Sequence, residues 1–142
     1  MVEDQSAIHV GVVLVTHADY GSALLRAAGF ILGEQDDCAS ISVDASLGVD
    51  ESFDRLKDAV LRLDKGMGVI ILTDMFGGTP TNMSLSLLGS HKVEVVTGVN
   101  LPMLLKVFSK RNMDLAELAA VAGDAGEKGI VVAADMLRKK KA

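Results

Sequence analysis

The chain has 142 residues, of which 49% are hydrophobic and 23% are charged, and its formal net charge is −5. This length and composition predict a single globular domain over residues 1–142, and the negative charge argues against nucleic acid as a partner, because phosphate contacts require a basic face. Cys38 is the only cysteine, which excludes an intrachain disulfide and a cysteine-based metal cluster.

The predicted elements alternate between strands and helices along the chain. Continuous apolar runs predict buried strands, and apolar residues spaced three and four apart predict helices. In chain order we expect a strand at 8–15, a helix at 20–32, a strand at 39–43, a helix at 49–63, a strand at 69–73, a helix at 80–88, a strand at 93–97, helices at 101–108 and 113–121, and a short strand at 130–134.

The two ends of the chain lie outside the predicted core of about residues 8–134. The N-terminal residues are acidic where a secretory signal would be basic, and no apolar run exceeds the length of a strand. We therefore expect a cytoplasmic protein with no membrane insertion. The basic tail at 138–142 is expected to be a frayed, solvated end, and the glycine-rich stretch at 123–129 is expected to act as a hinge before the last strand.

The alternation indicates a doubly wound α/β fold, with a mostly parallel sheet and helices on both faces. Ligands of such folds bind beyond the carboxyl ends of the strands, where the strand order reverses. His17 and Asp74 each come just after a predicted strand, so we expect them to converge on one edge of the sheet. His9 and His91 lie elsewhere and are interpreted as structural or surface residues.

His17 and Asp74 are a candidate pair of nucleophile and orienting group. A carboxylate that accepts the proton of one ring nitrogen fixes the tautomer, so that the other nitrogen presents its lone pair to an incoming phosphorus atom. Taken singly, each of the two could equally be a loop or cap residue.

The turn formed by Gly77, Gly78 and Thr79 opens a predicted helix and is a candidate phosphate-binding element. Glycines let the backbone approach an anion, and the first amides of a helix are unpaired donors. A tight turn with a helix cap is the alternative interpretation. The chain has no nucleotide-binding motif and no H-x-x-x-H pair, so we expect no cofactor and no metal, and a phosphoryl group supplied by another protein.

Three segments in order resemble the mannose-type enzyme IIA of the bacterial phosphoenolpyruvate-dependent sugar phosphotransferase system, a family that covers mannose, fructose and sorbose. The segments are 11–25, which contains His17, then 72–82, and then 98–103. The chain departs from the family at two positions. Ala18 stands where the family often has glycine, and Phe76 stands where it often has tryptophan.

The resemblance implies roles for particular residues and partners. His17 would be phosphorylated on Nε2, Asp74 would be its hydrogen-bonding partner, and Gly77, Gly78 and Thr79 would line the phosphoryl group. The donor would be the histidine phosphocarrier protein and the acceptor an enzyme IIB. The family fold further implies a homodimer in which the strand at 130–134 is exchanged. Because no IIB domain follows, we expect a free-standing IIA component, with regulation as an alternative to sugar uptake.

Two other classes stay open on the residues. A response-regulator receiver is also an α/β domain, and Asp74 could mimic its aspartate after the third strand. A receiver needs acidic residues after the first strand to hold magnesium and a lysine after the last strand, where this chain has His17 and Asp135. The third class is an interaction module with an inactive site.

Overall fold

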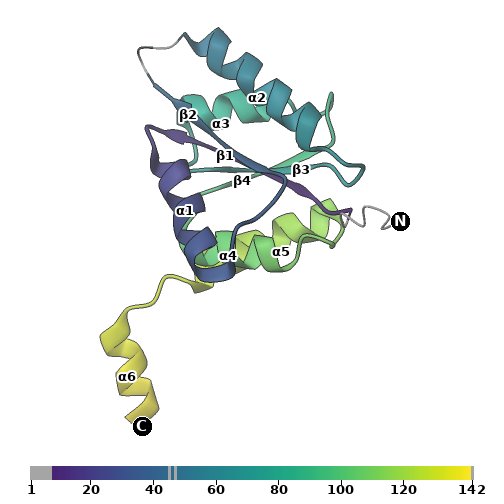
Figure 1. The fold of residues 1–142 in the computed structure, drawn as a ribbon. Coiled ribbons are helices and arrows are strands. Elements are labelled where there is room, and N and C mark those ends of the chain that lie inside the picture. The colour runs from purple at the N-terminus through teal and green to yellow at the C-terminus, as the bar shows by residue number, and fades with distance from the viewer. Residues whose placement is uncertain (1–7, 45, 47, 142) are drawn as a thin grey trace.

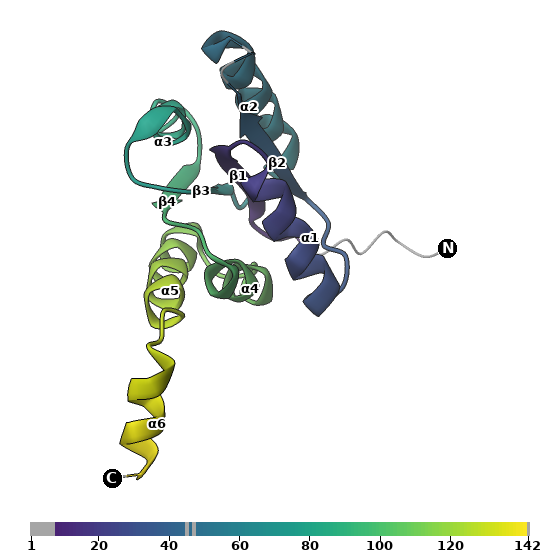
Figure 2. The same ribbon diagram turned by 90° about the vertical axis from the view of Figure 1, so that its left-hand side faces the viewer.

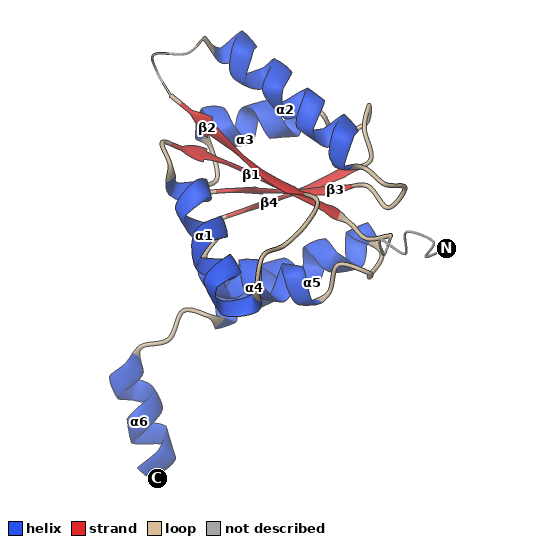
Figure 3. Ribbon diagram, viewed as in Figure 1, coloured by secondary structure: helices blue, strands red, loops and turns tan. Residues whose placement is uncertain are grey.

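The computed structural model describes residues 8–44, 46 and 48–141. Four parallel strands form one sheet in the order β2-β1-β3-β4. Figure 3 shows this sheet between two layers of helices, which confirms the predicted α/β fold. The strands are β1 (Gly11–His17), β2 (Cys38–Val43), β3 (Val69–Thr73) and β4 (Val93–Thr97).

The helices cover the two faces unequally. Figure 1 shows α2 and α3 on one face and α1, α4 and α5 on the other. Residues 11–16 and all of β3 are buried, as expected for central parallel strands. Alternate residues of these strands enter two separate cores, one under each layer of helices. The helices are α1 (Tyr20–Leu32), α2 (Val49–Leu63), α3 (Gly78–Leu85), α4 (Leu101–Ser109), α5 (Leu115–Lys128) and α6 (Ala133–Lys141).

Most of the predicted elements are present, and those up to β4 differ from expectation only at their ends. The helix at 20–32, the helix at 49–63 and the strands at 69–73 and 93–97 have the predicted bounds. β1 begins three residues later than predicted, because the N–H of Val10 bonds to the carbonyl of Arg111, 2.9 Å away, rather than to a strand. α3 begins at Gly78 and ends at Leu85, so it lies earlier than the predicted 80–88.

The predicted hinge at 123–129 is wrong. α5 continues to Lys128, and its glycines lie inside a helix. A Cβ atom on Gly126 would come within 2.7 Å of the Cε atom of Met103 in α4. The missing side chain at Gly126 therefore allows two helices to pack closely, and it does not mark a bend.

The predicted strand at 130–134 is not formed within the single chain. Residues 130–132 are in no strand of the described sheet, and α6 follows them, so the basic residues 138–141 belong to a helix rather than to a frayed tail. Residues 130–141 extend away from the body in Figures 1 and 2; we call this segment the arm. A strand requires a neighbour to complete its ladder, and the arm does not reach its own sheet. Its exchange with a second copy stays a prediction.

Over the part of the chain that the structure describes, no helix has the length and apolar character needed to cross a bilayer.

Candidate functional site

His17 and Asp74 meet at one edge of the sheet. His17 is the last residue of β1, and Asp74 follows the last residue of β3. These two strands are neighbours, with Val15 paired to Thr73, so their carboxyl ends come together. From β1 the chain moves outward to β2 on one side and to β3 and β4 on the other, which makes this the point where strand order reverses. The predicted convergence of the two residues is therefore confirmed.

One carboxylate oxygen of Asp74 holds His17 twice. Oδ2 of Asp74 lies 2.7 Å from Nδ1 of His17 and accepts the main-chain N–H of the same residue at 2.9 Å. Because a carboxylate can only accept here, Nδ1 carries the ring proton and Nε2 keeps its lone pair. The His17 side chain is 50% exposed and that of Asp74 is 15% exposed, so the histidine is accessible and its partner is sheltered.

The electrostatics of the pair keep Asp74 ionised. Burial on its own would raise the pKa of Asp74, but the hydrogen bonds from the main chain and ring of His17, with the electrostatic attraction between the two side chains, lower it below its ordinary value. The other oxygen, Oδ1, is buried and has no hydrogen-bond partner among the described residues. The carboxylate is thus available at neutral pH to orient the ring of His17.

The glycine turn lies beside the free nitrogen of His17. Gly77 and Gly78 have φ values of 85° and 81°, a left-handed conformation that favours glycine. A Cβ atom on Gly78 would lie 3.4 Å from Cε1 and 3.6 Å from Nε2 of His17, so this turn is adjacent to the ring. α3 begins here, and the first amides of a helix have no acceptor within it. The geometry offers donors for an anion next to Nε2.

Thr79 differs from the other predicted site residues because it lines a groove. It lines a groove of about 510 Å³ between α2 and α3, together with Val49, Phe53 and Met83. The structure thus brings His17, Asp74 and Gly78 together, and Thr79 lines the adjoining groove. The main-chain N–H of Thr79 still belongs to the first turn of α3.

Sequence reasoning missed two residues that shape this edge. Ala18 follows the histidine with a φ of 49°, a value that residues other than glycine rarely adopt. The hydroxyl of Tyr20 donates to the carbonyl of Val99 at 2.9 Å and so ties the start of α1 to the loop after β4. The family's frequent glycine at position 18 was the available signal for the first; the second contact spans 79 residues and has no local signal.

The third motif, at 98–103, has a structural role. Oδ1 of Asn100 accepts the N–H of Met103 at 3.0 Å and caps α4. Its amide group donates to the carbonyl of Gly126 in α5, also at 3.0 Å. This asparagine therefore joins two helices and lies outside the chemistry of His17.

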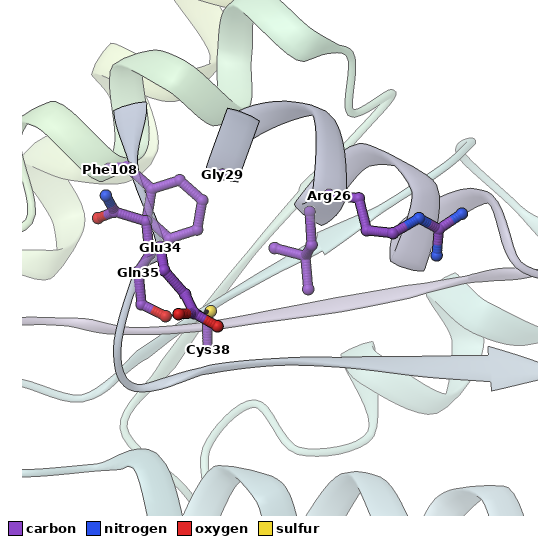
Figure 4. Close-up of a pocket in the computed structure, with 7 residues that line it drawn as sticks. Arg26, Gly29, Glu34, Gln35, Cys38 and Phe108 are labelled. Carbon is purple, nitrogen blue, oxygen red and sulfur yellow. Dashed lines mark hydrogen bonds between the residues drawn. The ribbon is translucent and has the colours of Figure 1, made fainter. Parts of the chain in front are cut away.

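A separate pocket lies far from His17. Figure 4 shows this pocket of about 430 Å³, which Arg26, Glu34, Cys38 and Phe108 line with three other residues. Cys38 is paired with Val12, five positions before His17 on β1, which corresponds to about 17 Å along a strand. Burial raises the pKa of the Cys38 thiol, which disfavours the nucleophilic thiolate. Among the described residues no cluster of three histidine, cysteine or acidic side chains could hold a metal ion.

Comparison with known proteins gives consistent matches over nearly the whole chain. A family model described as PTS system fructose IIA component matches residues 11–137. The mannose-specific EIIAB component of Escherichia coli (strain K12) is 31% identical over 124 residues, which are 85% of this chain. The chain spans only 38% of that relative's length. The fructose-specific EIIA component of Bacillus subtilis (strain 168) is 28% identical over 134 residues, 93% of this chain and 92% of the relative.

Solved structures agree with these relatives. EIIA from Streptococcus agalactiae superposes with a TM-score of 0.81 at 25% identity and covers 89% of this chain and 98% of its own. A IIA protein associated with the fucose utilization operon of Streptococcus pneumoniae also gives a TM-score of 0.81, at 27% identity, over 92% of this chain and 98% of its own.

Proposed function

We propose that this chain, which belongs to the mannose-type enzyme IIA family of the bacterial sugar phosphotransferase system, is a phosphohistidine carrier. It receives a phosphoryl group on His17 from the histidine phosphocarrier protein and passes it to an enzyme IIB. The observation that carries this proposal is the 2.7 Å contact between Nδ1 of His17 and Asp74, which leaves Nε2 free beside Gly78.

The transfer needs no group beyond the two proteins. Nε2 of His17 attacks the phosphorus atom of the donor phosphohistidine, a new N–P bond forms, and the donor nitrogen leaves with the electron pair of the bond that breaks. The ring of His17 keeps its Nδ1 proton and becomes positive, and the Asp74 carboxylate balances that charge. Amides of Gly77, Gly78 and Thr79 bind the phosphoryl oxygens during transfer. The same steps in reverse deliver the group to the acceptor.

The surroundings of His17 favour a protein as the donor. Met75 and Phe76 follow Asp74 and are 54% and 80% exposed. Two large apolar side chains next to a polar site suit contact with the face of another protein. The half-exposed imidazole is within reach of a phosphohistidine on such a face.

Phosphorylation in a purified system tests the proposal. With phosphoenolpyruvate, enzyme I and the histidine phosphocarrier protein, the chain should gain one phosphate that is labile to acid and stable to base, on the peptide that contains His17. Omitting the phosphocarrier protein should prevent the labelling. A base-labile phosphate that requires magnesium would indicate an acyl phosphate on Asp74 and a receiver domain. No phosphate at all would indicate an interaction module.

We also propose that the single domain forms a homodimer through the arm. Ile130, Val131 and Val132 are 76%, 51% and 65% exposed, and Met136 and Leu137 in α6 are exposed as well. An apolar segment of this kind is stable when it adds to the edge of another sheet, and a two-fold axis would make the exchange mutual. Deletion from residue 129 onward should give monomer or aggregate in sedimentation. Full-length protein that sediments as a stable monomer at micromolar concentration would contradict the exchange.

A further inference from the structure

Two buried threonines lie beneath the loop that joins β3 to α3. Thr73 is the last residue of β3, Thr81 lies in α3, and their side chains are almost fully inaccessible. Their hydroxyl oxygens are 2.8 Å apart. The Thr81 hydroxyl also bonds to the carbonyl of Met75, at 2.5 Å. A chain of two hydrogen bonds therefore runs from the strand, through the helix, to the loop.

The direction of these bonds is fixed by the number of protons. The Thr81 hydroxyl has one proton, and the Met75 carbonyl can only accept it. Thr73 must then donate its own proton to the oxygen of Thr81. Removing the Thr81 hydroxyl leaves the Thr73 hydroxyl and the Met75 carbonyl without this partner, whereas removing the Thr73 hydroxyl takes away one of the two bonds of Thr81.

The loop held in this way carries the glycine turn. Asp74 anchors its first residue to His17 through the carboxylate. In the part of the chain that the structure describes, the main chains of Met75 and Phe76 make no hydrogen bond to another main-chain group. Their side chains are largely exposed and add little packing. The hydrogen bond from the Thr81 hydroxyl to the Met75 carbonyl thus holds the middle of a loop whose ends are held by β3 and α3.

We propose that Thr73 and Thr81 are positioning residues for phosphoryl transfer, an inference that rests on the function proposed above. Their hydrogen bonds hold the loop that carries the glycine turn, in which a Cβ atom on Gly78 would lie 3.6 Å from Nε2 of His17. A donor that stabilises charge in a transition state contributes a factor of about 10²–10³ to the rate, and displacement of reacting groups by about 1 Å can cost about 10². Loosening the loop should therefore slow transfer without touching the reacting atoms.

The same helix offers a matched control. Ser84 is fully buried in α3, and its hydroxyl donates to the carbonyl of Pro80 at 2.7 Å. This bond has the same chemistry as that of Thr81, but it stays within the helix and does not reach the loop. A purely structural role of Thr81 predicts equal consequences for the two residues.

The test compares Thr81→Val, Thr81→Ser and Ser84→Ala with the wild type. The measurement is the maximal rate of a single transfer from an excess of phosphorylated histidine phosphocarrier protein, with thermal unfolding measured in parallel. Thr81→Val keeps the shape and loses the hydroxyl, and we expect its rate to fall about tenfold or more. Thr81→Ser restores the hydroxyl and should keep most of the rate. Ser84→Ala should lose stability and keep the rate.

Three outcomes would overturn the inference: an unchanged rate in Thr81→Val, an equal loss in Ser84→Ala, or a loss in Thr81→Ser as large as that in Thr81→Val. If Thr81→Val does not fold, Thr73→Val takes its place, with a smaller loss expected and an unchanged rate again contradicting the inference. A wild type that accepts no phosphate would overturn the proposed function itself, which separates the two failures.

Discussion

The two ends of β1 carry the same pair of residues in different surroundings. Before the strand, Nε2 of His9 lies 2.9 Å from Asp37, and at its last residue Nδ1 of His17 lies 2.7 Å from Asp74. Both pairs connect the strand to a neighbouring segment. The His9 side chain is 20% exposed and that of His17 is 50% exposed. A histidine bonded to an aspartate is therefore not a reactive site by itself.

The surroundings of the two pairs decide their roles. Near His9, the buried guanidinium of Arg111 donates to the carbonyls of Val10, Asp36 and Asp37 at 2.9, 2.6 and 2.8 Å. These hydrogen bonds pair the guanidinium of Arg111 with three main-chain carbonyls at this edge. Beside His17, the start of α3 presents amides that have no partner within the helix. We therefore expect one edge to stabilise the fold and the other to receive an anion.

The largest expected difference between the two edges is in the phosphorylation of variants that lack one histidine or the other. His17→Ala should abolish phosphorylation and leave the fold intact, because His17 is the histidine that lies beside the glycine turn. His9→Ala should be phosphorylated at the wild-type rate and should unfold at lower denaturant concentration, since Asp37 loses its partner. Labelling with ³²P and urea unfolding of both variants measure this. Residual labelling of His17→Ala would move the acceptor to another residue.

The edge that carries His9 and Arg111 should matter for stability alone. Arg111→Met retains a long apolar side chain but removes the donors to three carbonyls, and we expect a loss of about 3 kcal/mol in the free energy of unfolding. Urea unfolding measures the loss. At a temperature where the variant is fully folded, its transfer rate should equal that of the wild type. A folded variant with a reduced rate would show that the two edges are coupled.

Replacing Asp74 and Asp37 in turn should show which aspartate orients a reactive histidine and which one only supports the fold. In Asp74→Asn the amide oxygen can still accept from the ring, so we expect the transfer rate to fall about tenfold, a change of about 1.4 kcal/mol, rather than to vanish. Asp37→Asn should leave the rate unchanged. Single-turnover labelling measures both variants, and a wild-type rate for Asp74→Asn would make Asp74 only a turn residue.

Stability as a function of pH checks the same carboxylate. The pKa of Asp74 is lowered in the folded protein, so its charged form stabilises the fold above the ordinary carboxyl pKa of about 4. That contribution is lost as the pH falls through the lowered value. The difference in unfolding free energy between wild type and Asp74→Asn should therefore shrink in acid.

The smallest expected effect is the change in stability when glycine replaces a residue with left-handed backbone at either edge. Ala18 and Asp37 both have left-handed φ values, of 49° and 51°. Ala18→Gly should stabilise the protein by about 0.5 kcal/mol, because relief of the backbone conformation exceeds the added entropy of the unfolded chain. Asp37→Gly should destabilise it, because the bond to His9 is lost. Thermal unfolding measures both, and a destabilised Ala18→Gly would mean that the methyl group contributes packing.

The sequence predicted those features that depend on local pattern and on the topology of parallel sheets. His17 and Asp74 were placed together because each follows a strand, and adjacent parallel strands end at one edge. Arg111 and Thr81 act through contacts that no spacing encodes, the first across 101 residues. Gly126 indicated a hinge because glycine has two uses, flexibility and close packing, which look the same in a sequence. Residues 130–134 were predicted to form a strand, but among the described residues of the single chain no neighbouring strand pairs with them.

The place where the arm leaves the body bears on how a partner protein could reach His17. Gly129, at the end of α5, lies so close to Pro102 that a Cβ atom on the glycine would be 2.5 Å from the proline Cβ. Since α4 starts just beyond β4, the arm departs near the edge that carries His17, on the face opposite α2 and α3 (Figure 1). If a second subunit binds the arm, as proposed above, the α2 and α3 side would stay open to other proteins. Under the proposed function, donor and acceptor would both have to reach Nε2 of His17, so they would compete for the same surface. Turnover would then follow ping-pong kinetics.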